Sequence, residues 1–326
     1  MQYLIVGYGN VGHKRQIVLG NKCIGTVDPD PKQKSDYKLS RDVPEKIFNQ
    51  FETVIVSTPR QPKLKLVEYW LSKGKNVLVE KPLILSPSKA NLFSKIAKKN
   101  KVIWYTGYNH HFEENIQRLH KIIKEGSIGK LYHGKMEYSF GNIRELLGTW
   151  RETGYGDLDE AGCHLVDFAR LFFGYKGMNF KAISLRKNES KVFDQCVFAT
   201  TDDKIIFEAG WTTWKNVFKI DLYGTKGSVH VEGLRKWGES KLILRQRILP
   251  AGIPKEKIVI EKGKDNTWQK DIEYFEKMVK NHKNSMKTDI ENTKALINIA
   301  LSNNPKEKRI VYQKLQGLTD NYDYKI

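Results

Sequence analysis

The stretch YLIVGYGNVG, residues 3–12, joins a short apolar run to three glycines spaced G-x-G-x-x-G. The apolar run predicts a buried strand, and the pattern that follows it, as far as Leu19, predicts a helix. In the turn between them, the first glycine permits a tight bend, the second lets the backbone approach a pyrophosphate, and the third lets the helix pack closely on the strand. An ordinary glycine-rich turn is the alternative. The residues that this pattern assigns to dinucleotide binding are Gly7, Gly9, Asn10, Val11 and Gly12.

Strand and helix patterns continue to alternate as far as about residue 105. Apolar runs predict strands at 23–27, 54–57, 76–79 and 102–105, and amphipathic patterns predict helices at 63–73 and 86–100. Parallel neighbouring strands need long crossover connections, which these helices supply. The alternation therefore predicts a parallel sheet with helices on both faces.

After about residue 110 the rhythm changes to a succession of strands. Helices are predicted at 113–125 and 159–173, and two more close the chain at 266–283 and 289–303. The predicted strands of this half are 131–140, 180–185, 192–200, 204–212, 218–223, 228–231 and 242–249. Because turn signals separate successive strands, we expect them to form an antiparallel sheet.

These patterns predict two domains. The expected fold class is an α/β N-terminal Rossmann domain over residues 1–117 and an α+β C-terminal domain over residues 118–326 with a large, open, mostly antiparallel sheet. A chain of 326 residues also exceeds the size at which one hydrophobic core usually keeps growing. We expect the first domain to bind a dinucleotide and the second to bind substrate and a second copy of the chain.

The composition favours a folded protein without a disulfide framework or a metal site. Hydrophobic residues make up 40% of the chain, which is enough apolar material for real cores. No apolar run approaches the roughly 20 residues that span a bilayer, and the chain begins directly with the first strand, so we expect a cytoplasmic protein without membrane contact. Cys23, Cys163 and Cys196 lie far apart, which argues against disulfides and metal clusters.

The formal net charge of +19 favours anionic partners, such as phosphorylated cofactors, acidic or nucleotide-linked sugars, or nucleic acid. The lysines are spread through the sequence and form neither a basic arm nor a stripe along one helix. We therefore expect a small-molecule substrate and no nucleic acid.

Residues at the ends of the second and third strands extend the predicted cofactor site. Asp28 stands where an acidic side chain accepts hydrogen bonds from the adenosine ribose of NAD and repels the 2′-phosphate of NADP. Lys32 and Lys34 follow closely and partly offset that repulsion, so NAD is the expected cofactor and NADP stays open. A plain turn residue is the alternative for Asp28. The residues assigned to this site after the third strand are Ser57, Thr58 and Pro59.

The fourth strand ends in Glu80-Lys81-Pro82, at the carboxyl edge of the sheet where ligands of such folds bind. Together with the glycine turn and Ser57-Thr58-Pro59, this motif resembles the glucose-fructose oxidoreductase and inositol dehydrogenase (Gfo/Idh/MocA) family. The resemblance extends through Tyr108-Asn109 to GDLDEAGCHLVD at residues 156–167, so it covers essentially the whole chain. It implies NAD(P)-dependent chemistry on CH–OH groups and assigns Glu80 and Lys81 to the cofactor site as well.

Carried over to this sequence, the resemblance makes Lys81 the residue that orients and polarises substrate, and His164 the general acid or base. Glu160 falls where the family usually has aspartate, and in an α-helix Glu160 and His164 lie within about 40° on one face. Histidine titrates in the range useful for removing a hydroxyl proton, and a lysine cation stabilises a developing alkoxide. A surface lysine and a core histidine are the alternatives.

Two further residues are assigned to substrate binding beside Lys81 and His164. Asn109 follows the last strand of the first half, with helix capping as its alternative. Arg151 precedes the predicted catalytic helix and suits a phosphate or carboxylate on the substrate. The sequence departs from the family where Arg60 and Lys63 stand in the region of its usual histidine, and where His110-His111-Phe112 replaces its usual arginine.

The predicted function is hydride transfer between nicotinamide and a secondary alcohol or ketone of a sugar or sugar derivative, with an anionic or nucleotide-linked sugar favoured. A catalytically inactive dinucleotide-binding sensor or scaffold is the alternative from another class. Reduction of a non-sugar carbonyl or a cyclic diene is a closer one. We also expect a homodimer or homotetramer that forms through the C-terminal sheet.

Overall fold

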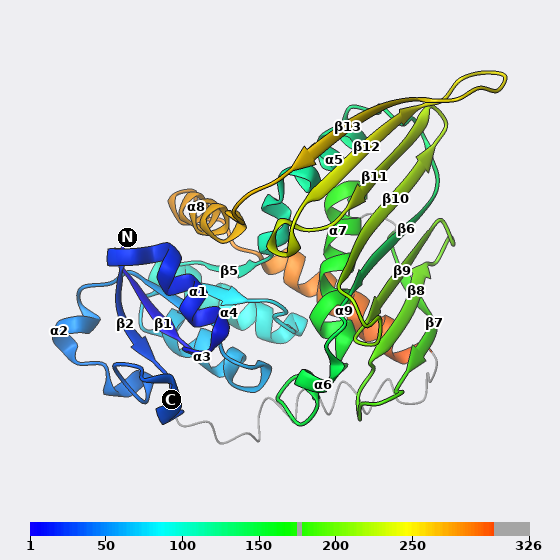
Figure 1. Ribbon diagram of the computed structural model, residues 1–326. Coiled ribbons are helices and arrows are strands. Elements are labelled where there is room, and N and C mark those ends of the chain that lie inside the picture. The colour runs from blue at the N-terminus through cyan, green and yellow to red at the C-terminus, as the bar shows by residue number, and fades with distance from the viewer. Residues whose placement is uncertain (175–177, 303–326) are drawn as a thin grey trace. The chain divides into compact units, whose positions relative to one another are not determined.

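The structure is a computed structural model that describes residues 1–174 and 178–302. Its contacts divide the chain into two compact units, both of which can be followed by element in Figure 1. Among the described residues, the first unit holds Met1–Asn109 and Trp268–Thr293, and the second holds His110–Thr267 and residues 294–302. The division after residue 117 stays a prediction. The contacts add that a late segment of the chain returns to the first unit.

The first unit contains a five-stranded parallel sheet in the order β2-β1-β3-β4-β5. Its strands are β1 Tyr3–Val6, β2 Cys23–Val27, β3 Thr53–Val56, β4 Asn76–Glu80 and β5 Trp104–Gly107. The helices that pack around it are α1 Asn10–Leu19, α2 Glu45–Phe48, α3 Arg60–Ser72, α4 Pro87–Asn100 and α8 Thr267–Lys280. The strand order reverses between β1 and β3, and open α/β sheets bind ligands outside the carboxyl ends of the strands at such a point.

Successive residues of these strands face opposite sides of the sheet, as the period of two requires. On one side, Leu4 and Val6 of β1 join a core with residues of α3 and α4. On the other side, Tyr3 and Ile5 pack with Phe275 of α8. Because helices cover both faces, the strands are mostly apolar, which is why their sequences show no regular polar alternation.

The second unit contains an eight-stranded sheet in the order β13-β12-β11-β10-β6-β9-β8-β7. Its strands are β6 Leu131–Ser139, β7 Phe180–Arg186, β8 Gln195–Thr200, β9 Ile205–Gly210, β10 Val217–Gly224, β11 Gly227–Glu232, β12 Ser240–Gln246 and β13 Lys255–Glu261. Its helices are α5 Glu114–Lys124, α6 Ile143–Leu146 and α7 Cys163–Phe173, and α9 Met286–Leu301 begins in the first unit and ends in the second. Neighbouring strands are antiparallel except β6 and β9, which are parallel.

The two faces of the large sheet differ in polarity. One face buries apolar side chains such as Met136 and Leu222 and is covered by α5 and α7 (Figure 1). The opposite face carries charged side chains, among them Lys135, which lies 2.8 Å from a carboxylate oxygen of Glu208. The expected large and mostly antiparallel sheet is therefore confirmed, and so is the Rossmann-type parallel sheet that precedes it.

Some elements differ from the sequence prediction. The strand β13 and the one-turn helices α2 and α6 were not predicted, because short or strongly charged segments give weak periodic signals. The predicted helix 159–173 begins with a π-helical turn, Leu158–Gly162, before α7. The last residue of the predicted helix 289–303 lies outside the described residues. Within the described part of the chain, no helix combines the length and the apolar character needed to cross a membrane.

Candidate active site

The glycine turn after β1 fits tightly against the end of β3. Gly7 has a φ of +91°, and a Cβ built on it would lie 2.7 Å from main-chain atoms of Ser57 and Thr58. A Cβ on Gly12 would lie 2.3 Å from the main-chain oxygen of Gly7. A Cβ on Gly9 would meet no atom within 4 Å. The first and third glycines are thus required by the fold, whereas the second leaves space above the loop.

The residues around this space suit a dinucleotide. The first turn of α1 contains no acidic residue, and its N-cap residue, Gly9, has no side chain that could cap the amide groups, so this helix terminus suits an anion. The buried hydroxyl groups of Ser57 and Thr58 have no hydrogen-bond partner among the described residues. A pyrophosphate and ribose bring the acceptors that such groups need, so the loop, the helix terminus and the end of β3 fit the cofactor that the sequence predicts.

Asp28 supports the glycine turn from the end of β2. One carboxylate oxygen accepts a hydrogen bond from the amide of Tyr8 at 2.7 Å, and the other accepts one from the amide of Asp30 at 2.9 Å. The carboxylate is half-buried and each of its oxygens keeps a second lone pair, so these bonds leave room for a ribose hydroxyl. Lys32 and Lys34 are exposed beside it. Its contact with the ribose stays a prediction.

Glu80, the first residue of the Glu80-Lys81-Pro82 motif, belongs to a buried ionic network. Its Oε1 accepts hydrogen bonds from Nε and Nη2 of Arg15 at 2.9 and 2.6 Å, and Nη2 of Arg15 also lies 2.6 Å from Asp271. Burial raises the pKa of the Asp271 carboxyl, and the charge of Arg15 opposes that shift. The network joins α1, β4 and α8, so Glu80 fixes its strand end to the glycine-turn helix.

The remaining predicted residues of the first unit follow neighbouring strands. Lys81 is half-buried directly after β4, and Asn109 is 6% exposed shortly after β5. Because β1, β3, β4 and β5 are parallel neighbours, Gly7, Ser57, Lys81 and Asn109 lie along the same edge of the sheet. The fold therefore collects the predicted cofactor residues at one edge.

In the second unit, His164 lies in a cluster of aromatic rings on the helix-covered face of the sheet. Its side chain is 3% exposed, and its ring centroid lies 4.7 Å from that of His110 and 5.6 Å from that of Tyr138. The hydroxyl group of Tyr138 lies 3.1 Å from Nε2 of His110. Burial raises the pKa of the Tyr138 phenol well above its usual value, and the charge of Glu160 adds to that shift. The phenol therefore stays protonated at neutral pH.

Lys236 reaches this cluster from the turn between β11 and β12. Nζ of Lys236 donates a hydrogen bond to the Tyr138 hydroxyl at 2.6 Å and lies 3.5 Å from Nε2 of His110. The ammonium also lies 4.5 Å from the ring of Trp237 and 5.7 Å from that of Phe140, within cation–π range. The Lys236 ammonium thus lies beside the hydroxyl group of Tyr138, whose ring in turn lies next to that of His164.

Glu160 and Arg151 lie close to each other, with 3.5 Å between Arg151 Nε and Glu160 Oε1. The guanidinium also stacks on Trp150 at 4.6 Å. Glu160 belongs to the π-helical turn, whose wider hydrogen-bonded ring changes the α-helical spacing on which its predicted alignment with His164 rested. Asp159 accepts a hydrogen bond from the amide of Tyr155 at 2.7 Å. In residues 1–174 and 178–302, no group of three His, Cys, Asp or Glu side chains is arranged for a metal ion.

Sequence reasoning missed the contributions of Tyr138, His110 and Lys236. Tyr138 was considered only as part of a predicted strand, and Lys236 is one of many lysines in a basic chain. His110 was noted only as a departure from the family. A search for polar residues near the ends of the predicted strands could have selected Tyr138 alone.

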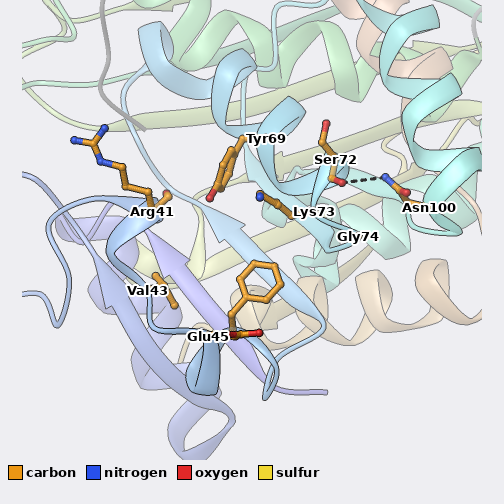
Figure 2. A pocket seen from close by; sticks show the side chains of 10 residues that line it. Arg41, Val43, Glu45, Tyr69, Ser72, Lys73, Gly74 and Asn100 are labelled. Atoms are coloured by element: carbon orange, nitrogen blue, oxygen red, sulfur yellow. Dashed lines mark hydrogen bonds between the residues drawn. The ribbon is translucent and has the colours of Figure 1, made fainter.

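A separate hollow of about 570 Å³ lies in the first unit beside α2 and the end of α3. Figure 2 shows Tyr69 and Lys73 along one side of it and Glu45 along another. Its lining comes from segments that lead into β3 and β4, at the amino edge of the parallel sheet. It is therefore distinct from the predicted dinucleotide site at the carboxyl edge.

Two domain models of one protein family match the chain. The model described as "Oxidoreductase family, NAD-binding Rossmann fold" matches residues 1–108, and the model described as "GFO/IDH/MocA C-terminal domain" matches residues 116–230. The two matches together span more than half of the chain, and they include Lys81 and His164.

Among curated proteins, the chain is 26% identical over 146 residues to scyllo-inositol 2-dehydrogenase (NADP(+)) IolW of Bacillus subtilis strain 168. The aligned stretch covers 43% of this chain and only 40% of that relative. The match therefore spans less than half of the relative's length.

Solved structures share the fold over nearly the whole chain. Levoglucosan dehydrogenase in complex with NADH has a TM-score of 0.77 at 15% identity, with 93% of this chain and 96% of that chain covered. UDP-N-acetylglucosamine 3-dehydrogenase GnnA from Acidithiobacillus ferrooxidans has a TM-score of 0.72 at 14% identity, with 93% and 97% covered. At sequence identities this low, the structural similarity shows a common fold and nothing beyond it.

Proposed function

The chain belongs to the Gfo/Idh/MocA family of oxidoreductases, whose first domain is an NAD-binding Rossmann fold, and from this premise we propose that it is an NAD(P)-dependent dehydrogenase or reductase of sugars. The proposed reaction moves a hydride between nicotinamide and a secondary alcohol or ketone of a sugar derivative. The observation that carries the proposal is the burial of His164 against His110 and Tyr138. In the first unit, Lys81 lies at the carboxyl edge of the parallel sheet, where the cofactor is expected.

The proposed roles follow from the chemistry of these side chains. When bound, the nicotinamide supplies the hydride acceptor or donor. The His164 imidazole exchanges a proton with the substrate hydroxyl, because histidine titrates near neutral pH. The ammonium of Lys81 binds and orients the reacting oxygen and stabilises negative charge on it. Burial keeps water away from the His164 imidazole, which strengthens its own electrostatic interactions.

We propose an anionic or nucleotide-linked sugar as the substrate. Arg151 motivated this class, but Glu160 lies beside it and offsets part of its charge. Lys236 supports the proposal independently, since it brings a cation to the Tyr138 hydroxyl beside His164. The net charge of +19 draws anions towards the protein in either case.

The test is the absorbance of reduced nicotinamide after the purified protein is mixed with NAD or NADP and matched pairs of sugars. Each pair contains a neutral sugar and its acid, phosphate or nucleotide-linked form. Turnover that is lost in Lys81→Met and in His164→Ala supports the proposal, and Lys226→Met, in the exposed β10–β11 turn, is the control. Tight cofactor binding by calorimetry without turnover on any pair would favour the sensor or scaffold function instead.

Cofactor choice and assembly are part of the same proposal. We propose NAD as the preferred cofactor, because Asp28 places a carboxylate at the end of β2. We also propose that the face of the large sheet opposite α5 and α7 pairs two copies of the chain, since eight strands offer a large surface. A preference for NADP in binding, or a monomer mass in light scattering, would overturn the respective part.

A further inference from the structure

Lys63 stands where the sequence departs from the Gfo/Idh/MocA pattern, and the structure buries it in the first unit. The residue lies near the start of α3 and is 4% exposed. Its Nζ donates hydrogen bonds to the main-chain oxygens of Glu80 at 2.8 Å and Lys81 at 2.9 Å, and lies 3.5 Å from that of Pro82. One ammonium thus holds three successive carbonyl groups of the segment that carries Lys81.

This segment has left the sheet and needs another support. The pairing of β4 with β5 ends at Glu80 and Gly107, so the carbonyl groups beyond it are outside the strand ladder. Arg15 holds the side chain of Glu80, and Lys63 holds the main chain on both sides of Lys81. The position of Lys81 is therefore set by two buried cations that come from α1 and α3.

We propose that Lys63 is a positioning residue, which fixes the main chain of Glu80-Lys81-Pro82 so that the Lys81 ammonium meets the reacting oxygen of the substrate. The inference rests on the proposed function of Lys81. An ammonium has three donors in a tetrahedral arrangement, which matches three neighbouring carbonyl groups. Hydrogen bonds to a charged donor are about twice as strong as neutral ones, so the support is stiff.

The test is Lys63→Ala compared with Lys75→Ala. Lys75 is a matched control, because it is 8% exposed in the same unit and its Nζ donates to the main-chain oxygens of Phe48 at 2.7 Å and Phe51 at 2.6 Å. Both changes remove a buried ammonium that binds carbonyl groups, but only Lys63 touches the Lys81 segment. We expect kcat to fall about 100-fold in Lys63→Ala, since small misplacements of reacting groups have effects of that size. For the control Lys75→Ala, we expect the wild-type affinity for NAD and no comparable loss of kcat.

Rescue separates positioning from general damage. Propylammonium replaces the carbons and the ammonium that alanine lacks, and we expect it to restore part of kcat in Lys63→Ala. Tetramethylammonium carries the same charge without N–H donors, and we expect no effect. Lys63→Arg keeps a cationic donor, so it should be more active than Lys63→Met and covers the case in which the alanine variant does not fold. Wild-type kcat in a folded Lys63→Met variant would overturn the inference.

Amide hydrogen exchange in residues 80–85 tests the same inference without activity. We expect faster exchange there in Lys63→Ala than in the wild type or in Lys75→Ala, because the segment loses its support. If the wild type turns over no sugar but this difference is found, the positioning of the segment stands and the proposed function fails. Equal exchange in all three proteins would overturn the positioning role whatever the activity.

Discussion

Glu113 makes the stability of the protein depend on pH near neutrality. The carboxylate is 1% exposed at the start of α5, 3.6 Å from Nε of Arg235 and 4.0 Å from Nδ1 of His110. Burial raises its pKa from the ordinary 4.5 to about 7, Asp265 adds to the shift, and Arg235 opposes it. Arg235 also pairs with Glu114 at 2.7 Å, so its charge is shared between two carboxylates.

The sign follows from the raised pKa in the folded protein. Between about pH 4.5 and 7 the folded protein keeps a proton that the unfolded chain has lost. The stabilising contribution is therefore complete below pH 4.5 and is lost as the pH rises through about 7. At about 1.4 kcal/mol for each pH unit between the two pKa values, the whole effect is about 3 kcal/mol.

Glu113→Gln replaces the carboxyl group with a neutral amide of the same shape. We expect the free energy of unfolding in urea to match the wild type near pH 4.5 and to exceed it by up to about 3 kcal/mol at pH 8. Glu125→Gln, at the exposed end of the same helix, is the control, and its difference from the wild type should stay below about 1 kcal/mol. A Glu113→Gln difference that is the same at every pH would refute the reasoning.

Three further predictions concern the cofactor turn, the ionic network and the substrate. Gly9→Ala should weaken NAD binding in calorimetry without lowering the melting temperature, because its Cβ would meet no protein atom. Gly12→Ala should instead lower the melting temperature, because its Cβ would lie 2.3 Å from a main-chain oxygen. Arg15→Met should cost about 3–5 kcal/mol in urea unfolding, because it leaves two buried carboxylates without their partner; a cost below that of an exposed Arg144→Met control would contradict this. Lys236→Met should raise KM about 10- to 100-fold for an anionic sugar but not for its neutral counterpart, because a hydrogen bond to a charged group contributes about 1.5–3 kcal/mol. Equal effects on both sugars would remove Lys236 from substrate recognition.

Local chemistry explains why much of the first unit could be predicted. The glycine spacing after an apolar run specified the turn, since Gly7 and Gly12 stand where backbone atoms leave no space for a side chain. The apolar strands reflected burial on both faces. The edge at which Lys81 and Asn109 lie followed from the parallel order, which needs no knowledge of side-chain contacts.

Long-range contacts explain what could not be predicted in the second unit. Tyr138, His110 and Lys236 come from separate segments, and hydrogen bonds between them have no sequence period. The π-helical turn before α7 changes the spacing of Glu160 and His164, because its wider ring departs from the α-helical repeat. The parallel pairing of β6 with β9 likewise joins strands that are far apart in the chain.

The sequence by itself determined the dinucleotide turn, the order of strands and helices, and the family to which the motifs point, because these depend on backbone conformation and burial at neighbouring positions. Only the tertiary structure decided the partners of the charged side chains. Arg15 binds both Glu80 and Asp271, the second of which lies 256 residues further along the sequence, and Lys63 binds the main-chain oxygens of Glu80 and Lys81. The sequence does not show whether a charged side chain is exposed or buried. Once the fold buries it, the side chain needs a specific partner, and only the tertiary structure shows which one.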